Sequence, residues 1–150
     1  MTIECFRRGP ARWVAGLLGF PPPGENVATL LVVERQGQEQ VWSRHFGEHR
    51  MISRQRLHRG GQMAERLGAF ECRFRLRPTP RGIDYEPVGA ALVAGPLRLP
   101  LPRPLAPRVT ATTWADERGM GLDVSISAPL LGRILRYHGF MTPEAEGAGL

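Results

Sequence analysis

The sequence predicts an all-β fold, a curled antiparallel sheet of about nine strands that forms a barrel or half-barrel with one short N-terminal helix. Three observations support this prediction. Apolar and polar residues alternate with a period of two in several segments, as they do in strands with one buried face. Turn signals recur at roughly 8–12-residue spacing, which is typical of all-β domains. The chain also has 18 Gly and 14 Pro, residues that favour turns over helix interiors.

The N-terminal part of the chain contains the predicted helix and the first predicted strand. The helix runs from about Arg12 to Gly19, and the proline triplet at 21–23 ends it. Residues 27–33 form an apolar, β-branched run, which predicts a strand that is buried on both sides. A turn is expected at Gln36-Gly37-Gln38 before the next strand.

The stretch VWSRHFGEHRMIS, residues 41–53, can be read either as a helix with a metal-binding histidine pair or as a hairpin. The alternation of residue types favours two strands, and Gly47 suits the first loop position of a type II′ turn. This hairpin places His45 and His49 on opposite arms. A third metal ligand, His58 or Cys72, has no characteristic zinc spacing. We therefore predict no metal site.

The second half of the chain shows the clearest alternation at residues 70–77. Phe70, Cys72, Phe74 and Leu76 alternate there with Glu71, Arg73, Arg75 and Arg77. The arginine face is expected to point outward, although an inward orientation stays open. Other strands are predicted near 62–67, 83–88, 109–114, 122–126 and 134–141. The proline-rich segment 95–107 predicts an extended loop over one mouth of the sheet, with its leucines packed back on the sheet.

The whole of residues 1–143 is predicted to form one antiparallel β domain, and residues 144–150 a disordered tail. No apolar run approaches the length of a membrane span or a signal sequence, so we expect a cytoplasmic protein without a transmembrane segment. Cys5 and Cys72 are expected to be reduced thiols, because two cysteines make no disulfide scaffold.

The chain is basic, with a net charge of +6, and all 20 of its basic residues are arginine. The absence of lysine excludes a Schiff base on a lysine side chain. The arginines alternate with acidic residues and form no basic helix or aromatic platform. We therefore expect no nucleic-acid partner.

Several stretches together resemble a known family. They are GLLGFPPPGENV, WSRHFG at 42–47, LPLPRPLAPRV, and APLLG at 128–132 followed by YHG at 137–139. In this order they are similar to the uncharacterised bacterial family called domain of unknown function 4166. The resemblance implies a domain that occurs alone or behind oxidoreductases of the saccharopine-dehydrogenase type. It implies no activity and no catalytic residues. The chain itself lacks the glycine fingerprint of a nucleotide-binding reductase.

A binding pocket is predicted on the concave side of the sheet. Trp42, Arg44 and Phe46 share one face of their strand, and a buried arginine needs an anion. We expect aromatic side chains to contact an apolar ligand body and Arg44 to bind an acidic head group. The predicted ligand-binding residues are Trp42, Arg44, Phe46, Trp114, Tyr137 and His138.

The predicted function is non-enzymatic binding of an apolar or amphiphilic small molecule, of which an acidic, lipid-like one is an example, without a cofactor or metal. One alternative is a protein-interaction or accessory domain of an NAD(P)-dependent oxidoreductase. Another is an enzyme that uses His45, His49 or His138. A trio of His138, Asp123 and Ser125 can be drawn across adjacent strands, but no serine lies in a nucleophile elbow. Catalysis is therefore the less favoured interpretation.

Overall fold

The computed structural model describes residues 1–5 and 9–142, which form one antiparallel sheet and one α-helix. The elements in chain order are β1 (Thr2–Cys5), α1 (Pro10–Leu17), β2 (Thr29–Gln36), β3 (Glu39–Phe46), β4 (His49–His58), the 3-10 turn η1 (Arg59–Gly61), β5 (Gln62–Leu67), β6 (Phe70–Thr79), β7 (Gly82–Ala94), β8 (Leu97–Pro100), β9 (Arg108–Asp116), β10 (Gly119–Ala128) and β11 (Gly132–Met141). The predicted tail, residues 144–150, lies outside the described residues.

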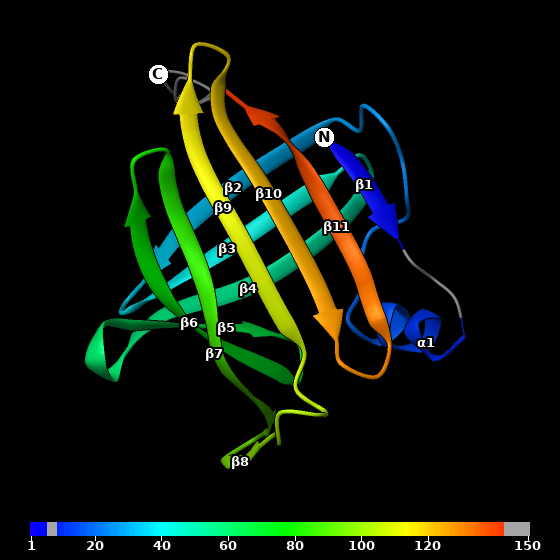
Figure 1. Cartoon of the computed structure of the whole chain (residues 1–150), viewed down its shortest axis with the longest axis vertical. Coiled ribbons are helices and arrows are strands. Elements are labelled where there is room, and N and C mark those ends of the chain that lie inside the picture. Colours follow the sequence, from blue (N-terminus) through cyan, green and yellow to red (C-terminus); the bar gives the residue numbers. More distant parts are fainter. Residues whose placement is uncertain (6–8, 143–150) are drawn as a thin grey trace.

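The sheet is strongly curled, as the sequence predicts. Its strand order is β1-β11-β10-β9-β7-β6-β5-β4-β3-β2, with β8 paired to β7 beside this path. In Figure 1, β9 to β11 lie in front of β2 to β4 and cross them at a large angle, while β5 to β7 connect the two halves. The result is a half-barrel with a concave inner face and a convex outer face. Because strand residues alternate between faces, parity along each strand decides which side chains point inward.

The two edge strands, β1 and β2, are linked at one end by residues 24–27. Ile3 forms a bridge with Gly24, and the N–H of Val27 donates to the carbonyl of Met1 at 2.8 Å. Beyond this link, β2 pairs only with β3. Its apolar residues are therefore partly exposed, at 45% for Leu30 and 38% for Val32. The prediction that this run is buried on both sides is wrong.

The hairpin predicted for residues 41–53 is confirmed as β3 and β4. Phe46 pairs with His49 across a two-residue turn, and Gly47 has φ +59°, the left-handed conformation that a type II′ turn needs there. The turn at Gly37 and the strand at 62–67 are also confirmed. His45 and His49 accordingly lie on opposite arms.

Of the eleven strands within residues 1–5 and 9–142, two, β1 and β8, are not predicted by the sequence. β1 has only four residues and no long apolar alternation. β8 lies inside the proline-rich segment that we expected to be a loop. It is a short strand beside the end of β7, a position that tolerates proline. Its leucines do not pack back on the sheet, because Leu97 and Leu99 are 56% and 53% exposed.

The core lies toward the end of the half-barrel where α1 sits beside the start of β11 (Figure 1). Phe20, Phe46 and Leu135 are almost fully buried there, together with Ile134. Phe20 follows α1 and closes this end of the inner face. The opposite end stays open enough to hold a cavity, which forms the candidate site.

Candidate functional site

The inner face of the half-barrel surrounds a cavity of about 310 Å³. Inward-facing residues from nine strands line it together with Met1, and most of them are apolar. The lining residues are Met1, Thr29, Leu31, Trp42, Arg44, Phe46, Gln55, Glu65, Phe74, Ile83, Tyr85, Val109, Ala111, Thr113, Met120, Leu122, Val124, Tyr137 and Met141. Only one arginine and one carboxylate occur among them.

These two charged residues, Arg44 and Glu65, form an ion pair inside the cavity. Nη2 of Arg44 lies 3.1 Å from Oε1 of Glu65, and the two side chains are only 12% and 20% exposed. Ser53, on the strand between them, completes the group. Arg44 donates to Oγ of Ser53 at 2.6 Å, and this hydroxyl donates to Glu65 at 2.5 Å. The long arginine side chain thus reaches from β3 across β4 to β5.

The electrostatics of the cavity keep its groups in fixed protonation states. Burial lowers the pKa of Arg44, but Tyr137 and Glu65 outweigh burial and raise it above its ordinary value. Burial also raises the pKa of both Tyr85 and Tyr137, and Glu65 adds to this effect. Near neutral pH, Arg44 is therefore charged and both phenols are neutral.

The ion pair also separates the main cavity from a smaller one. Arg44, Glu65 and Tyr137 line both, and the smaller cavity measures about 60 Å³. Phe20 and Cys72 line its far side, toward the packed core. Burial and Glu65 raise the pKa of Cys72 to about 12. This thiol is consequently neutral near neutral pH.

Gln55 is the cavity residue whose hydrogen bonding is incomplete. It lies on β4, is 5% exposed, and its Oε1 atom has no hydrogen-bond partner among the described residues. Buried polar side-chain atoms in proteins are nearly always paired. Because Gln55 lines the cavity, an unpaired acceptor lies in the cavity wall.

The structure brings four of the six predicted binding residues together. Trp42, Arg44, Phe46 and Tyr137 all line the cavity. The ring of Phe46 packs edge-on against Tyr137 at 5.3 Å, and the Arg44 guanidinium lies 5.3 Å from the centre of the Trp42 ring. These four side chains therefore share the concave face.

Trp114 and His138 do not line the cavity. Trp114 lies on the outer face, where its ring packs against Phe140 at 5.9 Å and occupies the space that a Cβ would need at Gly121. His138 lies opposite Asp123 on the outer face, next to the inward-facing Tyr137. Adjacent residues of one strand point to opposite faces, so the sequence alone could have separated His138 from Tyr137.

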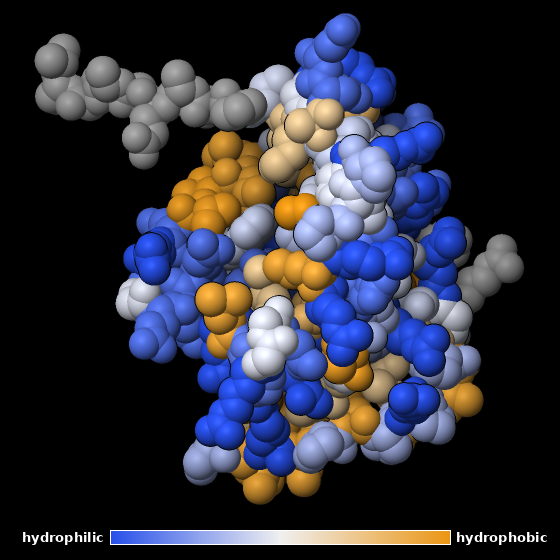
Figure 2. All heavy atoms as spheres, turned by 60° about the vertical axis from the view of Figure 1, so that its left-hand side comes forward, coloured by the Kyte–Doolittle hydropathy of each residue, from blue (hydrophilic) through white to orange (hydrophobic). Residues whose placement is uncertain are grey.

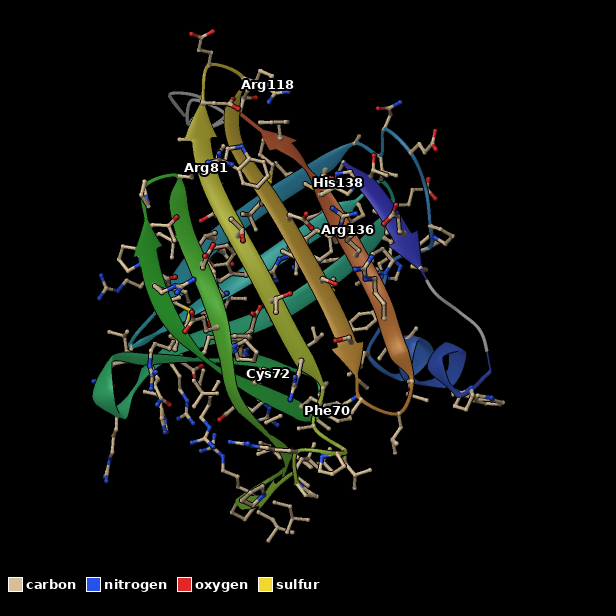
Figure 3. All side chains as sticks on the ribbon, viewed as in Figure 1. Phe70, Cys72, Arg81, Arg118, Arg136 and His138 are labelled. Atoms are coloured by element: carbon tan, nitrogen blue, oxygen red, sulfur yellow. The ribbon has the colours of Figure 1, made fainter. Side chains whose placement is uncertain are left out.

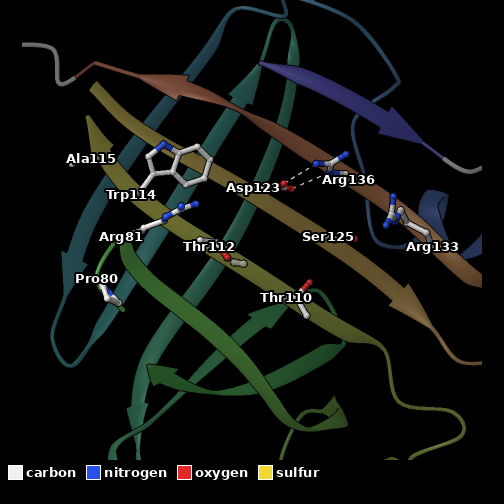
Figure 4. A pocket seen from close by; sticks show the side chains of 11 residues that line it. Pro80, Arg81, Thr110, Thr112, Trp114, Ala115, Asp123, Ser125, Arg133 and Arg136 are labelled. Atoms are coloured by element: carbon white, nitrogen blue, oxygen red, sulfur yellow. Dashed lines mark hydrogen bonds and ion pairs between the residues drawn. The ribbon is translucent and has the colours of Figure 1, made fainter. Parts of the chain in front are cut away.

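The outer face carries a wider, open trough of about 800 Å³, drawn in Figure 4. Trp114, Arg81 and Arg133 line it, and Arg136 donates two hydrogen bonds to Asp123, at 3.1 and 2.8 Å. These bonds are the largest influence on the pKa of Asp123 and lower it. Arg81 and Arg136 are also labelled in Figure 3. The trough is lined mainly by charged and hydroxyl side chains.

Among the described residues, His138, Asp123 and Ser125 do not show the hydrogen bonding of a catalytic triad. Asp123 is bound by Arg136, so the trio with His138 and Ser125 lacks the aspartate–histidine hydrogen bond that would orient a base. Nε2 of His49 lies 2.7 Å from the carbonyl oxygen of Gly19. Within the part of the chain that the structure describes, no three His, Cys, Asp or Glu residues are grouped to hold a metal.

Among the lining residues that the sequence did not predict are Glu65 and Gln55, the two on which the polar part of the site depends. Both lie on short or polar-looking strands, and they are register partners across β4 and β5. The arginine face of β6 points outward, where Arg77 pairs with Glu86 at 3.0 Å. The alternation of residue types along a strand predicts which side chains share a face. It does not predict which residues of other strands they contact.

Comparison with known proteins identifies a family for this chain. Neither the curated proteins nor the solved structures contained a match. The structure itself adds one separate finding: no helix among residues 1–5 and 9–142 has the length and apolar character of a membrane span. The family model that matches is described as a domain of unknown function, and it covers residues 1–141 of the 150. The chain is therefore a member of this family, DUF4166.

Proposed function

We propose that this domain binds an uncharged apolar or amphiphilic small molecule in its inner cavity and catalyses no reaction on it. The observation that carries the proposal is the cavity itself, about 310 Å³ of space bounded mainly by apolar side chains. Protein interiors are otherwise close-packed, with few voids larger than a water molecule. A space of this size is at the lower end of the range for small-molecule sites.

The charge arrangement supports an uncharged ligand. The predicted acidic head group was to supply the anion that a buried Arg44 needs. Glu65 already supplies that anion at 3.1 Å, so the pair leaves the cavity without net charge. An added carboxylate would have to compete with Glu65 and lose its hydration.

The titration properties support binding rather than catalysis. A general acid or base works best with a pKa near the working pH. The shifts of Arg44, Tyr85, Tyr137 and Cys72 are all upward from values that already lie above neutrality. None of these four groups is thereby prepared to exchange a proton near pH 7.

Native mass spectrometry of the protein purified from cells tests the proposal. We expect an additional mass that organic extraction removes. Ala111→Phe, which places a ring in the cavity, should abolish it. Thr110→Phe is the matched control. Thr110 directly precedes Ala111 on β9, but its side chain is exposed and lines the outer trough instead of the cavity. Recovery of apo protein only, with no binding in a panel of fatty alcohols and uncharged isoprenoids, would refute the proposal.

A second candidate function is a protein-interaction module that serves a partner oxidoreductase. The observation that favours it is the exposed apolar side of β2 and its neighbours, where Leu30, Val32 and Ile52 are 45%, 38% and 43% exposed. An open edge strand can pair with a strand of another protein. On the face shown in Figure 2, hydrophobic areas are separated by hydrophilic ones.

Replacement of Val32 by Glu separates the two candidates. It should abolish co-purification of a partner if β2 is the interface, and should leave the mass of a bound ligand unchanged if the cavity is the site. Retained partner binding in the Val32→Glu variant would exclude the interface at β2.

A further inference from the structure

We infer that the ligand of the cavity carries a neutral hydroxyl group, which donates a hydrogen bond to Oε1 of Gln55. This inference rests on the proposed function and specifies the chemical class of the ligand, an alcohol with an apolar body. Gln55 lies on the inner side of β4, and its side chain lines the cavity. With 5% exposure, it has little access to bulk water.

The unpaired acceptor is the first step of the argument. A buried acceptor without a partner costs about 1–3 kcal/mol, so its retention calls for an explanation. Two side chains of the neighbouring strand that line the cavity, Trp42 and Arg44, direct their donors to other partners. Nε1 of Trp42 donates to Gln40 at 3.2 Å, and Arg44 donates to Ser53 and Glu65. A ligand donor in the cavity would satisfy Gln55 without breaking these bonds.

The second step concerns charge. Gln55 and Glu65 are paired residues of adjacent strands and face the cavity together, so the local polar surface presents acceptor oxygens. A carboxylate ligand would place a second anion beside Glu65. An ammonium ligand would place a second cation near Arg44 and lose its hydration. A hydroxyl supplies the donor without either cost.

The third step concerns size. A water-sized group occupies about 30 Å³ in a liquid, so a cavity of about 310 Å³ holds roughly ten non-hydrogen atoms. The ligand class is therefore a short or medium-length apolar alcohol. The rings of Trp42 and Tyr85 and the methyl groups of Leu122 and Val124 are available to contact its apolar body.

Three probes with equal numbers of non-hydrogen atoms test this inference by isothermal titration calorimetry of the full chain. They are 1-nonanol, octyl methyl ether and octanoate. The ether is an isomer of the alcohol that keeps an acceptor oxygen but has no donor. We expect 1-nonanol to bind about tenfold more tightly than the ether, the ratio that one hydrogen bond provides. Octanoate should bind more weakly than the alcohol.

The variant Gln55→Met removes the acceptor at nearly constant volume. It should reduce the affinity for 1-nonanol about tenfold and leave that for the ether unchanged, because only the alcohol loses a bond. Gln36→Met, at the exposed end of β2, is the control and should change neither affinity. The midpoint of urea unfolding without ligand shows whether each variant folds.

The possible outcomes distinguish the inference from the proposed function. If the alcohol and the ether bind equally well, or if Gln55→Met lowers both affinities alike, the inference is wrong and the binding function stands. Tighter binding of the ether would mean that the amide nitrogen of Gln55 faces the cavity, which also overturns the inference. If none of the probes binds, the proposed function fails together with it.

Discussion

Two arginine–carboxylate pairs, one on each face of the same sheet, show what the environment does to identical chemistry. Inside, Arg44 pairs with Glu65 at 3.1 Å, with 12% and 20% of the side chains exposed. Outside, Arg136 pairs with Asp123 at 2.8 Å, with 33% and 34% exposed. The outer pair has the shorter contact, yet we expect the inner pair to cost more free energy of unfolding when it is broken. Desolvation, rather than distance, sets the cost of leaving one charge unpaired.

The comparison explains how one sheet can have an inner face that encloses an apolar cavity and an outer, solvated face. The inner pair cancels the charge that would otherwise exclude apolar molecules from the cavity. The outer pair lies in an open trough, where water and salt screen it. Breaking each pair in turn therefore measures the difference between the two faces.

The largest effect is expected for Glu65→Gln, which leaves the Arg44 charge without its anion. We expect a loss of about 3 kcal/mol in the free energy of unfolding, because breaking a buried pair exposes the full desolvation cost of the remaining charge. Urea unfolding measures it. Glu86→Gln, which breaks an exposed pair with Arg77, is the matched control and should cost under about 1 kcal/mol. Equal losses in the two variants would contradict the account.

The thiol of Cys72 should be protected in the folded protein. Its pKa is raised from 9.0 to about 12, so the reactive thiolate is about a thousandfold rarer than in the unfolded chain at the same pH. Alkylation by iodoacetamide at pH 8, followed by peptide mass spectrometry, should be slower by a similar factor in buffer than in urea. Similar rates under both conditions would show that the inner face is wetter than we describe.

Replacing both members of the inner pair should cost much less than breaking it. In Arg44→Met combined with Glu65→Leu, no charge stays buried, so we expect the free energy of unfolding to return to within about 1.5 kcal/mol of the wild type. A double variant as unstable as Glu65→Gln would indicate that shape, not charge, is what this pair contributes.

The smallest effect is expected for Asp123→Asn on the outer face, under about 1 kcal/mol near neutral pH. Arg136 lowers the pKa of Asp123 in the folded state. The contribution of Asp123 is therefore fully present above the pKa of an unfolded aspartate, about 4, and is lost as the pH falls below it. Wild type and variant should converge in stability in acid. A difference that persists at low pH would show that the aspartate acts by some means other than its charge.

Much of the fold could be predicted from local patterns. A period of two and well-placed glycines give the hairpin around Gly47 and the long strands β6, β10 and β11. The same alternation places Trp42, Arg44 and Phe46 on one face. β1 and β8 were missed because each has four residues, too few for a periodic pattern, and their pairing with β11 and β7 is long-range.

The rest of the site could not be predicted because it depends on register between strands. Nothing in residues 109–114 says which face of the strand turns inward, so Trp114 was placed in the pocket while Val109 and Ala111 actually line it. Glu65 is separated from Arg44 by a whole strand, β4, and the long Arg44 side chain reaches across that strand to form the pair. A single sequence contains no signal for such a pair.

The indole N–H resonances of the tryptophans give the most direct test of the central claim, that the inner face binds the ligand and the outer face does not. The chain has three tryptophans: Trp42 lines the cavity, Trp114 lies on the outer face and Trp13 is exposed. During a titration with 1-nonanol, followed by ¹H–¹⁵N NMR spectroscopy, we expect the Trp42 resonance to shift to saturation while the other two stay in place. A shift of Trp114 with no change at Trp42 would contradict the account.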